Sequence, residues 1–206
     1  MFRSTQLKIA AIGLVVLSAA CNSSSPSTTA TPASTPAAAA TSSEVTGIAP
    51  KNAIVTLIPA AGEPAMPAEP AVMDQVSKQF LPHTLMARVG QPVEFRNSED
   101  MPHNVTVLRR ESGSEVFNVS TDRGQKYVHT FDRVGQFDVK CDIHEGMEAT
   151  VIVTRGPLTV IAGDDGRFSI PNVAFGSYKA SVTFSGQTVE QPIEVSAART
   201  ELKLTR

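Results

Sequence analysis

The sequence predicts an all-β protein, in which a β-sandwich is followed by a smaller β module. From residue 44 onward, apolar and polar residues alternate in short runs, which is the period of a half-buried strand. Gly, Pro, Asp and Asn separate these runs, and no segment carries a clear helical period. This combination is typical of antiparallel sandwiches.

The runs follow one another along the whole of this region. Residues 59–70 interrupt them with four prolines, so a loop is expected there. The expected strands contain residues 53–58, 84–89, 93–95, 105–107, 127–131, 137–141, 151–153, 167–170, 176–184, 189–195 and 202–204.

The first 21 residues read as a signal peptide. Arg3 and Lys8 precede a short apolar run at 9–17, and small residues then lead to Cys21. The run is shorter than the about 20 apolar residues that a membrane-spanning helix needs. We therefore expect an exported protein.

The cysteine that follows the small residues resembles a bacterial lipobox, in which that cysteine is acylated. The resemblance implies lipidation at Cys21 and a lipid anchor on the periplasmic face of a bacterial membrane. Residues 18–20, Ser-Ala-Ala, would also suit an ordinary signal peptidase, which leaves both processing routes open.

The next segment, residues 22–43, consists of Ser, Thr, Pro and Ala apart from Asn22. Such a composition buries too little apolar surface to fold, so we expect a disordered linker with a reach of roughly 25 Å. Residues 44–155 then form the predicted main domain, and residues 156–206 the small module. About 50 residues are few for a core, so we expect the module to pack on the main domain and to borrow the strand at 53–58.

Only two cysteines are present, Cys21 and Cys141. If Cys21 carries lipid, Cys141 has no disulfide partner in an oxidising compartment. A disulfide between the two is the alternative reading. An unpaired thiol in an exported protein suggests a chemical role.

The segment from Cys141 to Met147 follows a predicted strand and has the spacing C-x2-H-x2-M, with His144 in the middle. Blue-copper (type 1) sites use two imidazoles, one thiolate and a weak axial thioether. One short loop can supply three of these ligands, and Gly146 gives it the freedom to turn. The missing imidazole is available at His103, which begins the predicted strand at 105–107.

These motifs resemble the cupredoxin family, in particular amicyanin, plastocyanin and pseudoazurin. The matching patterns are G-x-x-V-x-F-x-N from Gly90, M-P-H-N-V from Met101, and F-x-x-x-G-x-F-x-x-x-C-x-x-H-x-x-M from Phe131. The resemblance covers about residues 72–154. It implies a Greek-key β-sandwich that holds one type 1 copper.

The resemblance also assigns roles to individual residues. His103 would be the buried imidazole ligand, Cys141 the thiolate and Met147 the axial thioether. His144 would be the second imidazole, whose exposed edge serves as the electron port. Asn104 would join the two ligand loops by hydrogen bonds. No catalytic residue is expected.

The sequence departs from the family pattern at two places. Relatives often carry a hydroxyl residue beside the cysteine, whereas this chain has Asp142. Glu145 and Gly146 replace the Pro-aromatic pair of amicyanin. A carboxylate near the copper should stabilise the oxidised state and make the docking face less apolar.

The C-terminal stretch from Asp165 to Tyr178 resembles the carboxypeptidase regulatory-like (transthyretin-like) sandwich. Its residues include the turn Asp165-Gly166 and the strand residues Phe168 and Ile170. The resemblance implies a small accessory module without catalytic function.

These features favour an electron carrier that docks with a redox protein such as a cytochrome or a dehydrogenase. An enzyme is disfavoured because copper oxidases and nitrite reductases need further histidine clusters, and only four histidines are present. The alternative is a copper-binding or copper-delivery lipoprotein without electron-transfer duty; a metal-free scaffold is a further reading. Net charge is −2 and no basic cluster interleaves with aromatics, so nucleic acid is not an expected partner.

Overall fold

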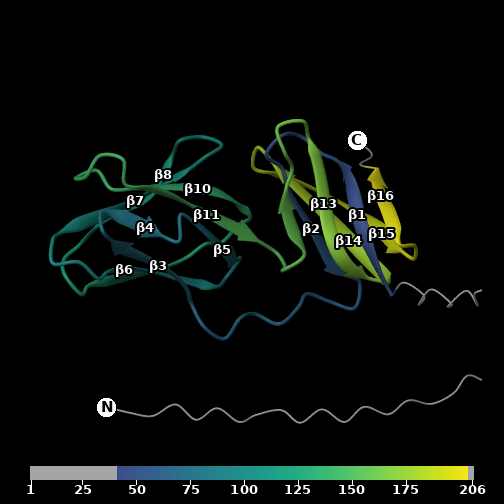
Figure 1. The fold of residues 1–206 in the computed structure, drawn as a ribbon, viewed down its shortest axis with the longest axis horizontal. Helices are drawn as coiled ribbons and strands as arrows, with labels where there is room; N and C mark the ends of the chain where they lie inside the picture. The colour runs from purple at the N-terminus through teal and green to yellow at the C-terminus, as the bar shows by residue number, and fades with distance from the viewer. Residues whose placement is uncertain (1–40, 204–206) are drawn as a thin grey trace, which may run out of the picture. The chain divides into compact units, whose positions relative to one another are not determined.

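The computed structural model describes residues 41–203, and their regular structure is entirely β, as predicted. Among these residues no helix is long and apolar enough to cross a bilayer. The strands form four sheets around two separate apolar cores, so this part of the chain contains two sandwiches (Figure 1). The predicted signal peptide, Cys21 and nearly all of the predicted linker lie outside the described residues.

The first sandwich contains strands β3 to β11. One sheet has the order β5-β11-β10-β7-β8 and the other the order β4-β3-β6-β9. Both sheets contribute side chains to one core, which includes Phe80, Phe95 and Phe137. The strands are β3 (Ala71–Val76), β4 (Gln79–Leu81), β5 (Thr84–Arg88), β6 (Pro92–Asn97), β7 (His103–Arg109), β8 (Glu115–Thr121), β9 (Lys126–Thr130), β10 (Gly135–Lys140) and β11 (Glu148–Thr154).

The alternation in the sequence explains how these strands face the core. Along β5, Leu85 and Ala87 are buried while Thr84 and Met86 are exposed. β5 pairs with β11 in parallel, although β10 and β11 are joined as antiparallel neighbours. Such neighbours from distant parts of the chain belong to a Greek-key sandwich.

The second sandwich combines the first two strands with the last five. Its sheets have the orders β13-β1-β16 and β12-β2-β14-β15 and share one core. In Figure 1 the purple strands β1 and β2 lie among green and yellow strands from the C-terminal end. The strands are β1 (Ser42–Ile48), β2 (Ile54–Pro59), β12 (Thr159–Ile161), β13 (Arg167–Ala174), β14 (Gly176–Phe184), β15 (Gln187–Val195) and β16 (Arg199–Lys203).

This pairing corrects the predicted domain boundary at residue 44. The residues of β1 and β2 were expected in the main domain, but they complete the sheets of the C-terminal module. The physical reason is core size, because Val45, Val55 and Leu57 add fully buried side chains to the few that the C-terminal strands supply. Borrowing of the strand at 53–58 is confirmed. β1 was not expected, and it begins inside the predicted linker at Ser42.

Gly47 shows how closely β1 is enclosed. β1 pairs with β13 on one side and with β16 on the other. A Cβ atom at Gly47 would lie 2.6 Å from the carbonyl oxygen of Leu202 and 2.6 Å from Cζ of Phe168. A residue without a side chain is therefore required at this point of the strand.

One of the two connections between the sandwiches is the loop from β2 to β3, where the prolines predicted a loop. Arg88 holds it in place by donating from Nη1 to the carbonyl oxygens of Pro64, at 2.9 Å, and Ala65, at 2.8 Å. This loop carries the chain from the second sandwich into the first.

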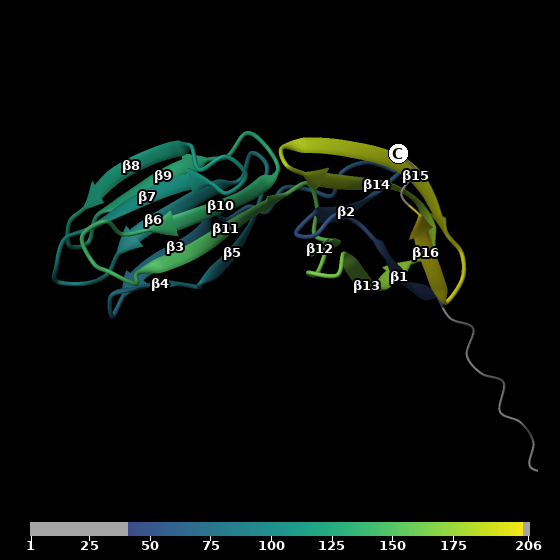
Figure 2. The same ribbon diagram turned by 90° about the horizontal axis from the view of Figure 1, so that it is seen from above.

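Strand direction brings distant sequence motifs to one end of the first sandwich. β10 is antiparallel to both β7 and β11, with Lys140 opposite Thr106 and opposite Glu148. The start of β7, the end of β10 and the start of β11 consequently meet at the same end. These three strands are neighbours in one sheet, and Figure 2 shows the sandwich that contains them from above.

Candidate metal centre

Three of the four predicted ligands lie together at this end of the first sandwich. Nδ1 of His103 and Nδ1 of His144 are 3.0 Å apart. The Cys141 sulfur lies 3.9 Å from the first of these nitrogens and 3.7 Å from the second. His103 and Cys141 are buried and His144 is partly exposed.

This triangle is small enough for one ion to reach all three atoms. Metal–imidazole and metal–thiolate bonds of a divalent first-row ion such as zinc measure about 2.0–2.1 Å and about 2.3 Å. Each edge of the triangle is shorter than the sum of the two bonds that would span it. The donor set of two imidazole nitrogens and one thiol is the set that type 1 copper uses.

His103 occupies the first position of β7 and is fully buried. Its Nε2 lies 2.8 Å from Oε2 of Glu99, whose carboxylate can only accept a hydrogen bond. Nε2 therefore carries the proton, and Nδ1 keeps its lone pair directed at Cys141 and His144. This is the tautomer that a metal ligand needs.

Hydrogen bonds favour the ionised form of the Glu99 carboxylate. Its other oxygen accepts a hydrogen bond of 2.7 Å from the backbone amide of Lys78. Burial raises the pKa of Glu99, but the bonds from His103 and from Lys78 outweigh it and leave the pKa below its ordinary value.

Asn97 shapes the loop that ends at His103. Its buried side-chain amide donates 2.8 Å hydrogen bonds to the carbonyl oxygens of Met101 and Thr121. Its Oδ1 accepts from the backbone amide of Glu99 at 2.9 Å. This local turn fixes the positions of Glu99 and His103 relative to each other.

The loop from Cys141 to Met147 closes on itself. The Cys141 amide donates to the Met147 carbonyl oxygen at 3.0 Å. Gly146 has a φ of +76° with open space around it, so conformation rather than crowding calls for glycine. Met147 is 1 % exposed and belongs to the same core cluster as Cys141.

His144 and its neighbours form the outer face of this loop. Ile143 is 57 % exposed, and Glu145 and Gly146 are exposed as well. Nε2 of His144 makes no hydrogen bond to the described residues. One edge of the cluster is therefore accessible from the surface.

Asn104 joins the two ligand loops. Its Oδ1 accepts a 2.7 Å hydrogen bond from the backbone amide of Asp142, the residue after Cys141. Its Nδ2 donates at 3.0 Å to Oδ2 of Asp142 and at 3.0 Å to Oδ1 of Asn118. The hydrogen bonds from Thr106, Lys140 and Asn104 hold the pKa of Asp142 far below its ordinary value.

Sequence reasoning missed three residues of this surrounding network: Glu99, Thr106 and Asn118. Glu99 could have been noticed as an acid four residues before a ligand histidine on the same turn. Thr106 could have been noticed as the residue two places after Asn104, on the same face of the strand. Asn118 gave no local signal, because its place depends on the pairing of β7 with β8.

The remaining histidines lie outside the cluster. His83 is exposed before β5. His129 is partly buried on β9, with its ring centroid 4.7 Å from those of Phe117 and Phe131. Burial lowers the pKa of His129, with Asp132 opposing this and Arg109 adding to it.

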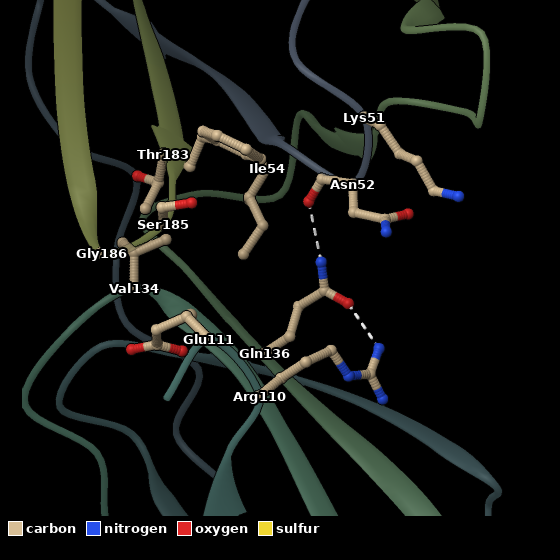
Figure 3. Close-up of a pocket in the computed structure, with 12 residues that line it drawn as sticks. Lys51, Asn52, Ile54, Arg110, Glu111, Val134, Gln136, Thr183, Ser185 and Gly186 are labelled. Atoms are coloured by element: carbon tan, nitrogen blue, oxygen red, sulfur yellow. Dashed lines mark hydrogen bonds between the residues drawn. The ribbon is translucent and has the colours of Figure 1, made fainter. Parts of the chain in front are cut away.

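A separate pocket of about 190 Å³ contains none of the predicted ligands. Gln136 crosses it, donating at 2.8 Å to the Asn52 carbonyl oxygen and accepting at 2.7 Å from Arg110 (Figure 3). Arg110 is also engaged by Asp138. The side chains of Gln136 and Arg110 thus have hydrogen-bond partners.

Comparison with known proteins points to the same part of the chain. Residues 70–154 match the family model described as copper binding proteins, plastocyanin/azurin family. An amicyanin from Paracoccus versutus is 30% identical over 89 residues, which cover 43% of this chain and 67% of the relative. A plastocyanin from Ginkgo biloba is 29% identical over 84 residues, covering 36% of this chain and 85% of the relative.

Solved structures of cupredoxins also match part of the chain. A purple cupredoxin from Nitrosopumilus maritimus is 22% identical, covering 41% of this chain and 99% of its own, with a TM-score of 0.37. A reduced amicyanin mutant is 25% identical, covering 53% of this chain and 98% of its own, with a TM-score of 0.39.

Proposed function

Because this chain belongs to the plastocyanin/azurin family of copper-binding proteins, we propose that it is a single-electron carrier of the cell envelope. Its cofactor is one copper ion. The proposed ligands are His103, Cys141, His144 and Met147. Bound copper would supply a centre that alternates between the cupric and cuprous forms.

The observation that carries the proposal is the convergence of one thiol and two imidazole nitrogens within a 4.8 Å cluster. The thiolate favours Cu(I), and the imidazoles bind both oxidation states. A site held by buried side chains and hydrogen bonds changes little when the charge of the ion changes. Retention of copper in both states distinguishes a carrier from a delivery protein.

The proposed route for the electron is the exposed side of the loop. His144 is a ligand candidate that is also partly exposed, and the apolar Ile143 stands beside it. A redox protein such as a cytochrome or a dehydrogenase could approach the ring edge there. Because Glu145 places an exposed carboxylate beside this contact, the affinity for the redox partner would depend on the salt concentration.

The remaining parts of the proposal concern location and the second sandwich. We propose export, acylation at Cys21 and a position on the periplasmic face of a bacterial membrane, with residues 22–43 as the tether as far as β1. The second sandwich would be a transthyretin-like accessory module. No enzymatic reaction is assigned to the chain itself.

The test is to load the purified protein with one equivalent of Cu(II), then to record its visible spectrum and its voltammogram. We expect an intense blue thiolate band and a reversible one-electron wave, with copper retained in both states. Cys141→Ser should abolish the band. Retention of Cu(I) alone would support the delivery alternative and contradict the carrier.

Two histidine variants provide a matched comparison. His144→Gly should lose the blue spectrum, and added imidazole should restore it by filling the vacated ligand position. His83→Gly removes an exposed histidine outside the cluster and should leave the spectrum unchanged. Equal effects of the two variants would contradict the ligand assignment.

A further inference from the structure

The carboxylate of Asp142 has four polar partners, although the residue lies on a loop. Its Oδ2 accepts from Thr106 Oγ1 at 2.5 Å, from Asn104 Nδ2 at 3.0 Å and from Asn118 Nδ2 at 3.1 Å. Its Oδ1 pairs with Lys140 Nζ at 2.9 Å. Hydrogen bonds to a charged acceptor are about twice as strong as those between neutral groups.

The donors come from three neighbouring strands. Asn104 and Thr106 lie on β7, Asn118 on β8 and Lys140 at the end of β10. Thr106 is buried and its hydroxyl donates to Asp142, so a missing carboxylate would leave this buried hydroxyl without its acceptor. The carboxylate is therefore the shared acceptor that closes this end of the sheet.

The same residue is joined to the cluster through its backbone. Its amide donates to Oδ1 of Asn104 at 2.7 Å, and Cys141 precedes it directly. The backbone amide of Asp142 thus binds Oδ1 of the Asn104 side chain, and the Asp142 carboxylate binds its Nδ2. Rotation of that amide is blocked, and the Cys141 backbone is held against β7.

A hydroxyl side chain at this position could not do the same. It has one oxygen, which cannot serve three donors and Lys140 together, and it brings no charge. The carboxylate adds a fixed negative charge one residue from the thiol. Such a charge favours the more highly charged form of a bound metal.

We propose that Asp142 is a positioning residue, whose carboxylate locks the Cys141 loop onto β7 and β8 and biases the site towards Cu(II). The bias towards Cu(II) rests on the proposed copper binding, whereas the lock concerns the metal-free protein. The charge and the lock therefore need separate measurements.

The charge is tested with Asp142→Asn, which keeps an acceptor oxygen for Thr106 and Asn118 but removes the charge. We expect the ratio of Cu(II) to Cu(I) affinity to fall about tenfold, which corresponds to about 59 mV for one electron. The matched control is Glu145→Gln, because Glu145 is exposed on the same loop and has no hydrogen bond or ion pair within residues 41–203. It should shift the ratio less than about twofold, since no hydrogen bond holds its carboxylate in place, whereas three donors hold that of Asp142.

The lock is tested with Asp142→Ala in the metal-free protein by hydrogen exchange of backbone amides. The amides of residues 141 and 142 should exchange at least about tenfold faster, while those of β14 in the second sandwich should not change. If the Ala variant does not fold, Thr106→Val removes one donor only and should give a smaller acceleration at the same two amides. Unchanged exchange at residue 142 would overturn the lock.

The outcomes separate this inference from the proposed function. A protein that takes up no copper in the blue form, yet shows faster exchange in Asp142→Ala, would contradict the function and leave the lock standing. A blue protein in which Asp142→Asn and Glu145→Gln shift the affinity ratio equally would overturn the assigned bias.

Discussion

The two sandwiches bury their polar groups very differently. In the second sandwich the buried polar residues carry only hydroxyl groups, at Ser43, Thr56, Ser181 and Thr183. In the first sandwich the buried polar residues include an imidazole, two kinds of amide side chain and a carboxylate: His103, Asn97, Asn104, Gln75, Gln91 and Glu94. Many of these lie near the end where the proposed ligands meet.

The difference shows which part of the fold is built for chemistry. Burying an amide or an imidazole costs free energy unless each polar atom is hydrogen-bonded. The second sandwich avoids this cost with a core whose buried polar groups are only hydroxyls. The first sandwich accepts it, and the hydrogen bonds of Asn97 and Asn104 hold the two loops that carry the proposed ligands.

A pair of leucine truncations would test the comparison most strongly. Leu57→Ala in the second core and Leu85→Ala in the first should each lower the free energy of unfolding by roughly 2–5 kcal/mol. Urea unfolding measures this loss. The visible spectrum of the copper-loaded Leu57 variant should be unchanged, and a changed spectrum would mean that the second core supports the site.

Asn97→Ala should show the cost of a buried amide in the first sandwich. Its removal deprives the Met101 and Thr121 carbonyl oxygens and the Glu99 amide of their partner. We expect a loss of roughly 2–4 kcal/mol in the free energy of unfolding, because each unsatisfied buried group costs about 1–3 kcal/mol. Copper affinity should fall as well.

Its control is Thr183→Val in the second sandwich, where a buried hydroxyl is removed. That variant should lose less stability and keep its copper affinity. An Asn97 variant with intact copper affinity would show that the turn before His103 is not needed for the site.

Glu99→Gln should weaken the site with a smaller effect on the fold. The neutral amide no longer fixes the tautomer of His103 through a charged acceptor. Residues that orient a ligand histidine are worth about 10–100-fold in metal affinity, which is the loss expected here. Competition with a copper chelator measures it, and Glu145→Gln is the control on an exposed carboxylate.

The smallest expected effect is a pH dependence that belongs to His129. Because burial lowers the pKa of His129, the folded protein keeps this imidazole neutral over a pH range in which the unfolded chain, with a pKa of about 6.5, is already protonated. Stability should therefore decrease as the pH falls below about 6.5. His129→Phe should flatten this slope in thermal unfolding of the metal-free protein.

The sequence was most informative where spacing is local. The three candidates from the 141–147 loop follow from one short motif, and the His103 motif supplies the fourth. The sandwich was likewise predicted from short runs of alternating apolar and polar residues and from the order of the family motifs along the chain. These signals depend on neighbours in the chain, which a sequence shows directly.

It was least informative where partners are distant. β1 pairs with strands more than a hundred residues away, so nothing near Ser42 indicated that the predicted linker ends in a strand. Likewise, Asn118 reaches Asp142 only because β8 lies beside β7. Both the position of β1 and the contact of Asn118 with Asp142 depend on strand pairing between distant parts of the chain.

The most direct test is X-ray absorption at the copper K-edge of the protein loaded with one equivalent of copper. Convergence of His103, Cys141 and His144 predicts two nitrogen neighbours and one short sulfur neighbour in both oxidation states. Loss of the sulfur neighbour is expected in Cys141→Ser. A copper shell of nitrogen and oxygen only in the unaltered protein would contradict the account.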